Sequence, residues 1–390
     1  MRLLYRFSGP VTNKVIHSQV VGTLAALQRE GIPVDLAGWS GLGHALAHRA
    51  AYREAEAALR RQLPARFHRT IDRLPGLDRF LKRRELSQAI ARAGGEHVVL
   101  QTRSHDLAFL MADLRQARPA LRFVYEVRGD FRAEAESQRG PGPHPGLERF
   151  EEAMGRALRR ADLVLCVSQV LAERMLQRHD LEAGRLFVMP CTADEERFRP
   201  DAGLRRQRRA ELGLAEEDLL LVYSGSLVKG WDVPERIREF LQAQLPAQAG
   251  LHVLLLSPDT EQAQALVAQL PAGRAHHRSV DHWSMQSWLC AGDAGLLLRA
   301  AHPLNEAASP TKAAEFLLCG LPLLISPGVG DYSAWVAENG LGLLIDPDPR
   351  RGVDWPAVRA LDPREIRRQA LERVARSTHV RRLAERLRAL

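Results

Sequence analysis

The stretch from Glu306 to Pro322 combines residue types that suit a phosphorylated ligand. Ser309 is a good helix N-cap and Pro310 suits the first helical position, so a helix is predicted to begin here. Lys312 then lies in the first turn, where the helix dipole disfavours a cation unless an anion binds beside it. Glu315 follows on the same face, where its carboxylate can accept two ribose hydroxyls. A surface ion pair between Lys312 and Glu315 is the alternative, but the joint occurrence of cap, anion site and carboxylate favours binding.

A second loop, Tyr223–Asp232, suggests related chemistry. It follows an apolar run typical of a strand and precedes a predicted helix that begins near Val233. Gly225 and Gly230 permit close approach of the backbone to a ligand, and exposed N–H groups at a helix start attract anions. Lys229 would neutralise a diphosphate there. A plain turn with a solvated lysine explains the same pattern.

The scarcity of lysine supports both loops. Only four of the 55 basic residues are lysines, and they are Lys14, Lys82, Lys229 and Lys312. A lysine retained in an arginine-rich chain can be needed as a compact point charge. Two of the four fall in these two loops, so we expect them to meet on one ligand.

A third loop, Ser8–Lys14, joins the first predicted strand to the first predicted helix. Gly9 permits a tight turn in it. The loop lacks the GxGxxG spacing, so it carries no dinucleotide fingerprint. By itself it does not identify a ligand.

Ten short apolar runs predict the strands that must position these loops. They alternate with amphipathic runs such as Ser18–Glu30 and Leu147–Arg160, which predicts βαβ units and parallel sheets. In such sheets, ligands lie beyond the carboxyl ends of the strands, where the three loops fall. The predicted strands are Arg2–Phe7, Pro33–Trp39, Val98–Gln101, Arg122–Val127, Leu163–Val167, Leu186–Met189, Leu219–Tyr223, Leu251–Leu256, Gly295–Leu298 and Pro322–Ser326.

A polar, arginine-rich run that ends at Leu212 separates two series of strands. The predicted fold class is therefore α/β, with two Rossmann-like, doubly wound parallel-sheet domains that face a cleft. The predicted domains are residues 1–198 and 199–375. Residues 376–390 are predicted to form a C-terminal helix that could pack back on the first domain.

Composition restricts the class of protein. The chain has 390 residues, of which 45% are hydrophobic and 26% charged, as in ordinary globular proteins of two domains. No apolar run approaches the roughly 20 residues that a membrane-spanning helix needs. The four cysteines form no CxxC pair, which disfavours a zinc site and favours a cytoplasmic location.

Much of the net charge of +8 lies between Arg49 and Arg92, where twelve Arg and Lys accompany five Asp and Glu. Such a basic segment suits an anionic membrane surface, an anionic substrate or nucleic acid. A solvated helix face in an arginine-rich chain explains it equally well. No recognised nucleic-acid module is present, so nucleic acid is the least favoured partner.

With these motifs in order, the sequence resembles the retaining GT-B-fold glycosyltransferases of family 4 over nearly its whole length. Ala161–Glu173 is similar to their ADxVxxVS segment. Met189–Asp194, with Phe198 and Pro200, is similar to their PxGVDxxxFxP linker. Ser309–Pro322 is similar to their donor motif and is the most specific match. Residues 1–198 would then be the acceptor-side domain and residues 199–375 the nucleotide-sugar-binding domain.

The resemblance implies a nucleotide-diphosphate sugar as donor and a role for each matching residue. Glu315 would bind the ribose, and Lys229 and Lys312 would bind the diphosphate and act in catalysis. Arg128 is also implied in catalysis, because it lies in a segment that resembles a loop bordering the sugar. The other residues implied in donor binding are Gly9, Ser226, Val280, Arg299, Pro310 and Thr311.

The sequence departs from the family pattern in three places. Near Ser226 the usual loop arginine is absent, and Arg299, at the end of a strand, could substitute for it. Ala307 stands where the first of two paired glutamates would fall, and Glu306 is one residue away. The histidine usual in the first domain has no match near Arg128. Donor chemistry is therefore better supported than orientation of the sugar.

For such an enzyme, the resemblance implies same-face attack with retention of configuration. Lysines and a helix N-terminus would stabilise the leaving diphosphate, so no protein nucleophile, metal or cofactor is required. The one DxD, Asp346–Asp348, lies in a proline-rich turn. The expected acceptor is a saccharide or lipid-linked molecule, used in cell-envelope polysaccharide synthesis in the cytoplasm. Peripheral contact with the inner face of the membrane is left open.

Two other classes of protein remain open. A sugar-nucleotide epimerase or hydrolase of the same fold would share the donor site, and a specific acceptor would distinguish a transferase from it. A non-catalytic protein that binds sugar nucleotides or polyanions would fit the basic segment and the missing arginine. Turnover would distinguish an enzyme from such a protein.

Overall fold

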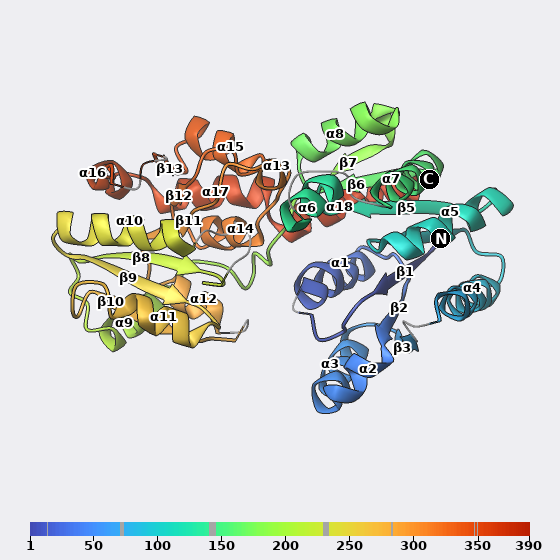
Figure 1. The fold of residues 1–390 in the computed structure, drawn as a ribbon, viewed down its shortest axis with the longest axis horizontal. Helices are drawn as coiled ribbons and strands as arrows, with labels where there is room; N and C mark the ends of the chain where they lie inside the picture. The colour runs from blue at the N-terminus through green and yellow to red at the C-terminus, as the bar shows by residue number, and fades with distance from the viewer. Residues whose placement is uncertain are drawn as a thin grey trace. The chain divides into compact units, whose positions relative to one another are not determined.

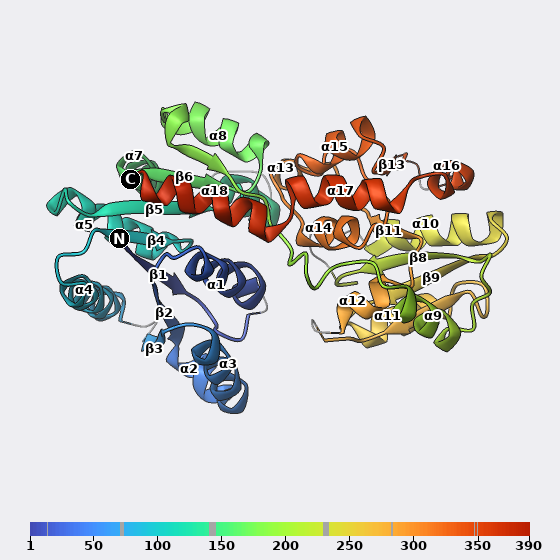
Figure 2. The same cartoon turned by 180° about the vertical axis from the view of Figure 1, so that it is seen from behind.

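The computed structural model describes the chain except for residues 14, 71–73, 140–145, 229–233, 282–283, 347 and 349. It divides into two compact units, the first formed by Met1–Pro190 with Arg376–Leu390 and the second by Cys191–Ala375. Each unit is a parallel β-sheet with helices on both faces (Figures 1 and 2). The predicted α/β class with two doubly wound sheets is therefore confirmed. Residues 191–198, which the sequence places in the first domain, group with the second unit.

The first unit holds a seven-stranded sheet with the strand order β3-β2-β1-β4-β5-β6-β7. Its strands are β1 (Arg2–Ser8), β2 (Val34–Gly41), β3 (Ala65–Thr70), β4 (Val98–Thr102), β5 (Arg122–Val127), β6 (Leu163–Cys166) and β7 (Leu186–Val188). Its helices are η1 (Ile16–Val21), α1 (Gly22–Arg29), α2 (Leu42–Ala47), α3 (Arg49–Gln62), α4 (Pro75–Arg92), α5 (His105–Ala117), α6 (Phe131–Arg139), α7 (Leu147–Arg160), α8 (Gln169–His179), η2 (Ala183–Arg185) and α18 (Arg376–Arg388).

Successive side chains of β1 point to opposite faces of this sheet and meet different helices. Tyr5 lies in the core formed with α1, α3 and α18. Arg6 is fully buried on the other face, where its Nε donates a 3.1 Å hydrogen bond to Glu85 of α4. Helices α3 and α4 therefore cover different faces, and the basic segment 49–92 is divided between them.

The second unit holds a six-stranded sheet with the order β10-β9-β8-β11-β12-β13. Its strands are β8 (Leu219–Ser224), β9 (Leu251–Leu256), β10 (Ala275–Arg278), β11 (Ala294–Leu297), β12 (Leu323–Ile325) and β13 (Gly342–Leu344). Its helices are α9 (Ala202–Glu211), α10 (Pro234–Ala247), α11 (Thr260–Val267), α12 (Met285–Leu289), α13 (Pro303–Glu306), α14 (Thr311–Leu318), α15 (Tyr332–Glu338), α16 (Trp355–Arg359) and α17 (Pro363–Arg373).

The linker before β8 packs on the second unit. Phe198 is buried in that unit's core, and Arg367 of α17 donates a 2.8 Å hydrogen bond to the Phe198 carbonyl. Ala193 forms an isolated parallel bridge with Ala375. These contacts explain why the division falls at Pro190.

All ten predicted strands are present with small shifts at their ends, and three strands were not predicted, namely β3, β10 and β13. Within the described part of the chain, every helix is too short or too polar to cross a bilayer.

Candidate functional site

The strand order of the second unit reverses between β8 and β11, because β9 and β10 extend the sheet on one side and β12 and β13 on the other. Ligands of open parallel sheets bind at this point, beyond the carboxyl ends of the strands. The loops that follow β8 and β11 lie here, and they carry most of the predicted site residues.

Helix α14 packs closely on the sheet at this point. A Cβ on Gly295 of β11 would lie 2.6 Å from the ring of Phe316, so the glycine lets the helix approach. The N-cap of α14 is Pro310, which provides no side-chain cap. The Ser309 Oγ instead accepts a 2.9 Å hydrogen bond from the backbone N–H of Cys191, because the linker packs against this loop. The prediction of Ser309 as the N-cap is therefore wrong.

Lys312 connects α14 with the loop after β8. Its Nζ lies 5.7 Å from the centroid of the Tyr223 ring, a distance at which a cation is attracted to an aromatic face. The Tyr223 hydroxyl donates a 2.6 Å hydrogen bond to the backbone carbonyl of Ser226. The structure thus brings together Lys312 and Ser226, which the sequence places in separate loops. Lys229 lies outside the described residues.

The other predicted residues of this motif share the same helix. Pro310 and Thr311 lie at its start, and Glu315 follows one turn after Thr311. Glu315 is only 8% exposed. Helix α14 therefore presents a cation and a carboxylate on neighbouring turns, the combination that a nucleoside diphosphate needs.

The Asp259 carboxylate accepts hydrogen bonds from backbone N–H groups of the loop after β8. The Asp259 Oδ2 accepts hydrogen bonds from the Ser226 hydroxyl at 2.6 Å and the Leu227 N–H at 2.7 Å. The Val228 N–H also donates to it, at 3.3 Å. The hydrogen bond from Ser226 holds the pKa of Asp259 below its usual range. The expectation that this loop exposes its N–H groups to an anion is therefore wrong for Leu227 and Val228.

Arg299 is held within the loop after β11. Its backbone N–H donates to the Ser326 hydroxyl at 2.9 Å, and its Nη1 donates to the Asn305 side chain at 3.2 Å. Arg299 also lines a cavity of about 100 Å³, together with Asp346. The structure therefore gives Arg299 a role in supporting the loop that carries α13.

Gly330, in the loop after β12, completes this support. Its φ is +49°, and its N–H donates a 2.9 Å hydrogen bond to the Asn305 carbonyl. A Cβ at this position would overlap the carbonyl oxygen of Ala308. Only glycine fits, so the two loops next to α14 are packed directly against each other.

Val280 lies beyond β10, at one edge of the sheet. It packs partly buried against the core of the second unit, as does Met285. The Ser224 hydroxyl lies 3.6 Å from the Met285 Sδ, which links α12 to the end of β8.

The first unit has its own cavity, of about 370 Å³, at the carboxyl ends of β1 and β4. Gly9, with φ at +138°, lies in its wall, and its N–H donates to the Trp39 carbonyl at 2.8 Å. His105, at the start of α5, also lines the cavity, and its Nδ1 lies 2.5 Å from the Tyr125 hydroxyl. Burial lowers the pKa of His105, so its imidazole is neutral at neutral pH.

Asp106 and Arg103 add charge to this cavity. The Asp106 Oδ2 accepts 2.8 Å and 2.7 Å hydrogen bonds from the Ser8 hydroxyl and the Lys82 ammonium. Arg103 lines the cavity, and Arg128 follows β5 on the same unit. Gly9 and Arg128 thus belong to the first unit, whereas the other predicted residues belong to the second.

Comparison with known proteins supports the family resemblance. Residues 17–197 match the model of Glycosyltransferase Family 4. Solved structures similar to the whole chain include HepE of Anabaena with UDP, at 14% identity and TM-score 0.70, and the same protein with UDP-glucose, at 15% and 0.68. Sucrose-phosphate synthase of Thermosynechococcus elongatus follows at 16% and 0.64, and all three alignments cover 100% of both chains. No curated protein sequence matches the chain.

The family model and the shared fold together support a family 4-like glycosyltransferase. Its two parallel sheets have the GT-B fold of these solved structures. The matched segment, residues 17–197, comprises most of the first unit.

Within the described part of the glycosyltransferase, no group of three or more His, Cys, Asp or Glu is placed to hold a metal ion. The Asp348 N–H donates a 2.8 Å hydrogen bond to the Asp346 carboxylate. Arg351 and Arg350 pair with them at 3.4 Å and 3.1 Å, respectively. The DxD therefore has arginine partners.

Two residues of the glycosyltransferase sites were not predicted from the sequence. His105 begins the helix after β4, and Asp259 lies just before the helix after β9. Each follows the carboxyl end of a buried strand, and this position was the signal that could have identified them.

Proposed function

We propose that the glycosyltransferase transfers a sugar from a nucleotide-diphosphate donor with retention of configuration and without a divalent metal. The observation that supports this is the position of Lys312, in the first turn of α14 and over the ring of Tyr223 in β8. A fixed cation beside a helix N-terminus stabilises negative charge that develops on a leaving diphosphate.

The donor is proposed to lie along α14. Glu315 would accept the ribose hydroxyls, and Lys312, with Lys229 from the β8 loop, would hold the diphosphate. The similar HepE structures contain UDP and UDP-glucose, so uridine diphosphate sugars are the first donors to test. Arg299 and Ser226 would support the loops around the phosphates, and Val280 would border the base.

A donor screen tests this proposal. Sugar nucleotides with uracil, guanine, adenine and thymine should be compared by thermal shift, because a bound donor stabilises the folded protein by about 2.7 kcal/mol at a hundredfold excess over Kd. The best donor should then be incubated with saccharide and lipid-linked acceptors. Transfer with retained anomeric configuration, observed by NMR, and activity that persists in EDTA are expected.

Other products would separate the alternatives. Acceptor-independent release of free sugar indicates a hydrolase, and an altered sugar nucleotide indicates an epimerase. Binding without turnover over all donors and acceptors indicates a binding protein. Activity lost in EDTA and restored by Mg²⁺ or Mn²⁺ contradicts metal independence.

We also propose that α4 of the first unit contacts an anionic membrane surface or a lipid-linked acceptor. Large apolar side chains are exposed on and just before this helix, namely Leu74, Leu77, Phe80 and Leu81. Arg83 and Arg84 lie beside them. This α4 patch, formed by these six residues, has the apolar and basic groups that bind anionic lipids at an interface.

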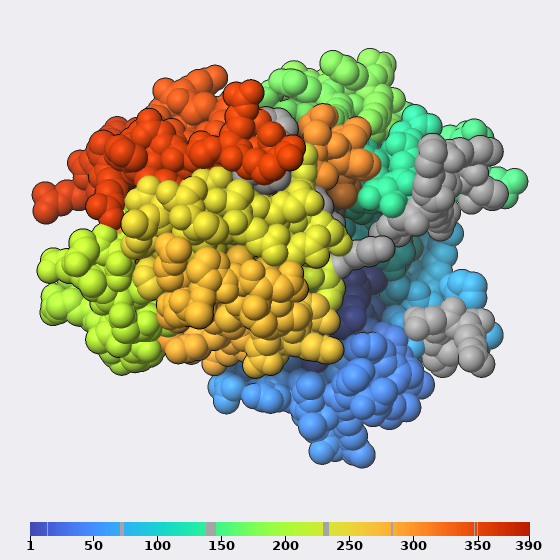
Figure 3. All heavy atoms as spheres, turned by 60° about the vertical axis from the view of Figure 1, so that its left-hand side comes forward, coloured from blue at the N-terminus to red at the C-terminus, as the bar shows by residue number. Residues whose placement is uncertain are grey.

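Ion pairs account for half of the described arginines in the basic segment. Of the described arginines between positions 49 and 92, half already pair with carboxylates, namely Arg60, Arg66, Arg69, Arg79 and Arg92. Arg49, Arg53 and Arg61 have no such pair among the described residues, but they lie on α3, part of the exposed blue surface at the bottom of Figure 3. The α3 arginines therefore provide a matched control for those of α4.

Vesicle co-sedimentation tests this contact. The protein should sediment with phosphatidylcholine vesicles only when they contain phosphatidylglycerol. Near a membrane each arginine contributes about 1 kcal/mol, so Arg83→Gln with Arg84→Gln should weaken binding roughly tenfold or more. Arg53→Gln with Arg61→Gln should have a smaller effect. Equal binding to neutral and anionic vesicles would contradict the proposal.

A further inference from the structure

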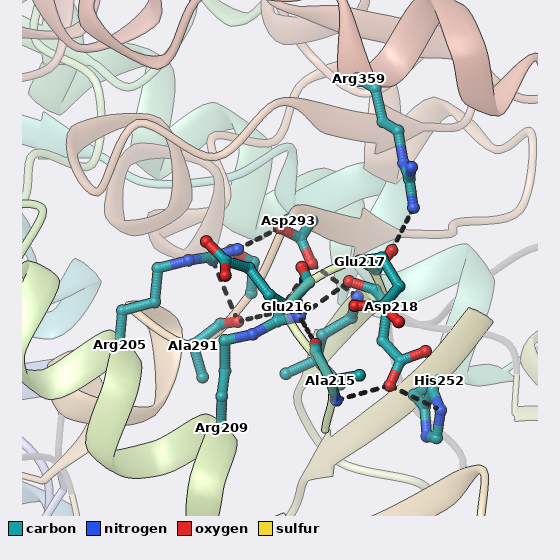
Figure 4. A network of polar contacts seen from close by, with 12 residues as sticks. Arg205, Arg209, Ala215, Glu216, Glu217, Asp218, His252, Ala291, Asp293 and Arg359 are labelled. Carbon is teal, nitrogen blue, oxygen red and sulfur yellow. Dashed lines mark hydrogen bonds and ion pairs between the residues drawn. The ribbon is translucent and has the colours of Figure 1, made fainter. Parts of the chain in front are cut away.

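A cavity of about 560 Å³ lies at the amino ends of β8, β11 and β12, at the opposite edge of the second sheet from Lys312. One wall is held by ion pairs, in which Arg205 and Arg209 bind Asp293 at 2.6 Å and 3.0 Å (Figure 4). Arg209 also donates a 2.7 Å hydrogen bond to the Ala215 carbonyl. The cavity wall is therefore rigidly built, and the proposed transfer reaction makes no use of it.

Two cysteines line this cavity. Cys290 is the C-cap of α12 and Cys319 is the C-cap of α14, and both face the same space. The Cys290 thiol lies beside that of Cys319, and its S–H donates to the Arg199 carbonyl at 3.4 Å. The Gln286 Nε2 donates to the Cys290 Sγ at 3.3 Å. The two residues are 6% and 5% exposed, so the cavity is their route to a small reagent.

We propose that Cys290 and Cys319 are a redox-active thiol pair that a hydroperoxide converts into a disulfide. The Cys290 sulfur attacks the peroxide oxygen, the O–O bond breaks, and the sulfenic acid of Cys290 forms with release of water or an alcohol. The Cys319 sulfur then attacks the Cys290 sulfur, the S–O bond breaks, and a second water leaves. The two thiols lose two electrons and two protons, and the hydroperoxide gains them.

The surroundings of the pair favour Cys290 as the attacking thiol. The hydrogen bond from Cys319 lowers the pKa of Cys290, and the charge of Arg205 acts in the same direction. Cys166 provides a contrast, since burial alone raises its pKa to about 12. The thiolate is the nucleophile in such reactions, so Cys290 is expected to react first and Cys166 to stay reduced.

The disulfide would connect α14, which carries proposed donor residues, to α12. Helix α14 bears Lys312 and Glu315, and α12 is linked to the end of β8 through Met285. A covalent bond between their C-caps would draw the helices together. This consequence rests on the proposed donor site, and we expect oxidation to weaken donor binding about fivefold.

Peptide mapping tests the thiol pair without reference to the donor. The folded protein should be treated with hydrogen peroxide, alkylated with iodoacetamide and digested with trypsin. We expect one linked species that joins residues 279–299 to residues 313–350, lighter by two hydrogens than the sum of the two peptides. Dithiothreitol should release both peptides.

Cysteine-to-serine variants serve as controls for the proposed disulfide. Cys191→Ser should leave the linked species unchanged, whereas Cys290→Ser should abolish it. If Cys290 and Cys319 remain fully alkylatable after peroxide, or if either pairs with Cys191, the proposal is overturned. Donor affinity should then be measured on oxidised and reduced protein. An unchanged affinity with the linked species present would refute only the coupling to the donor site.

Discussion

The two sheets of the glycosyltransferase share one topology but differ in the charge at the point where their strand order reverses. In each unit, an aspartate at the start of a neighbouring helix holds the end of the first strand or the loop after it. Asp106 binds Ser8 in the first unit, and Asp259 binds Ser226 in the second. Asp106 follows β4, on the reversal side of β1, whereas Asp259 follows β9, on the other side of β8.

We expect the two carboxyl edges to favour different ligands for this reason. In the crevice between β1 and β4, the Asp106 carboxylate is paired with Lys82 and Arg103 also lines the cavity, so opposite charges offset one another there. In the second unit, Asp259 lies on the β9 side of β8. The charged side chain at the crevice between β8 and β11 is therefore Lys312. Shared topology therefore determines where a ligand binds, and the loop residues determine its charge.

The strongest test of the comparison is Lys312→Ala. Because the lysine contact strengthens as charge develops, the variant should lose about 10²–10³-fold in kcat/KM. Lys312→Arg should rescue poorly, since a planar guanidinium does not replace a compact ammonium. A double-mutant cycle with Lys229→Ala should be non-additive, because both lysines act on one charge. Near-wild-type rates in both single variants would remove the second crevice as the diphosphate site.

Glu315→Gln should have a smaller effect, on binding rather than on chemistry. The amide keeps the shape of the side chain but weakens the bond to the ribose hydroxyls, so nucleotide affinity should fall about tenfold. Isothermal titration with the best nucleotide measures this change. Chemical denaturation should show little loss of stability, and unchanged affinity would show that the ribose lies elsewhere.

The pH dependence of the free energy of unfolding tests whether the His105 imidazole in the first crevice is buried and neutral. The folded pKa of His105 is depressed below 6.5 by burial, so the unfolded chain binds its proton more readily. The contribution of the neutral imidazole to stability is therefore present above pH 6.5 and is lost as the pH falls towards the folded pKa. Wild-type stability, measured in urea from pH 7 to 5, should decline more steeply than that of His105→Asn. Parallel curves would contradict a neutral buried imidazole.

The smallest effect is expected for Asp259→Asn. Its carboxylate is exposed to solvent, which screens its charge, and an amide oxygen can still accept from Leu227. The donor KM should change by no more than about threefold. The folded pKa of Asp259 is depressed, so the interaction is present above its unfolded pKa of 3.8 and is lost as the pH falls through the folded value. A loss as large as that of Lys312→Ala would show that Asp259 contacts the donor.

The sequence predicts the interior of both sheets well and misses three of their four edge strands. The ten predicted strands are apolar runs buried between helices, a pattern visible in any window of residues. The unpredicted strands β3, β10 and β13 lie at sheet edges. Strands β3 and β10 are half-buried and rich in Arg and His, and β13 has only three residues. An edge strand is covered on fewer sides, so apolar composition does not mark it.

The candidate site shows the same limit. Lys312 and Ser226 were found because each lies in a loop of recognisable chemistry. The capping assignment of Ser309 was wrong because its partner, Cys191, is distant in the sequence. His105 and Asp259 were missed because a single polar residue after a strand has no local pattern, and only the fold shows what it contacts.

The first unit is built from two distant parts of the chain, and this has a consequence for its synthesis. Helix α18 closes the core of that unit with Val380, Leu383, Ala384 and Leu387, each at most 1% exposed. Arg376 at its start donates a 3.0 Å hydrogen bond to the Ser18 carbonyl. On the ribosome, this helix is made only after the whole of Cys191–Ala375.

At about 5–20 residues per second, translation of that intervening unit takes on the order of 10–40 s. During this time the nascent first unit has an apolar groove where α18 will bind. We therefore expect the second unit to complete its fold first, although it is translated later, and the newborn chain to depend on chaperones until Arg376–Leu390 is made.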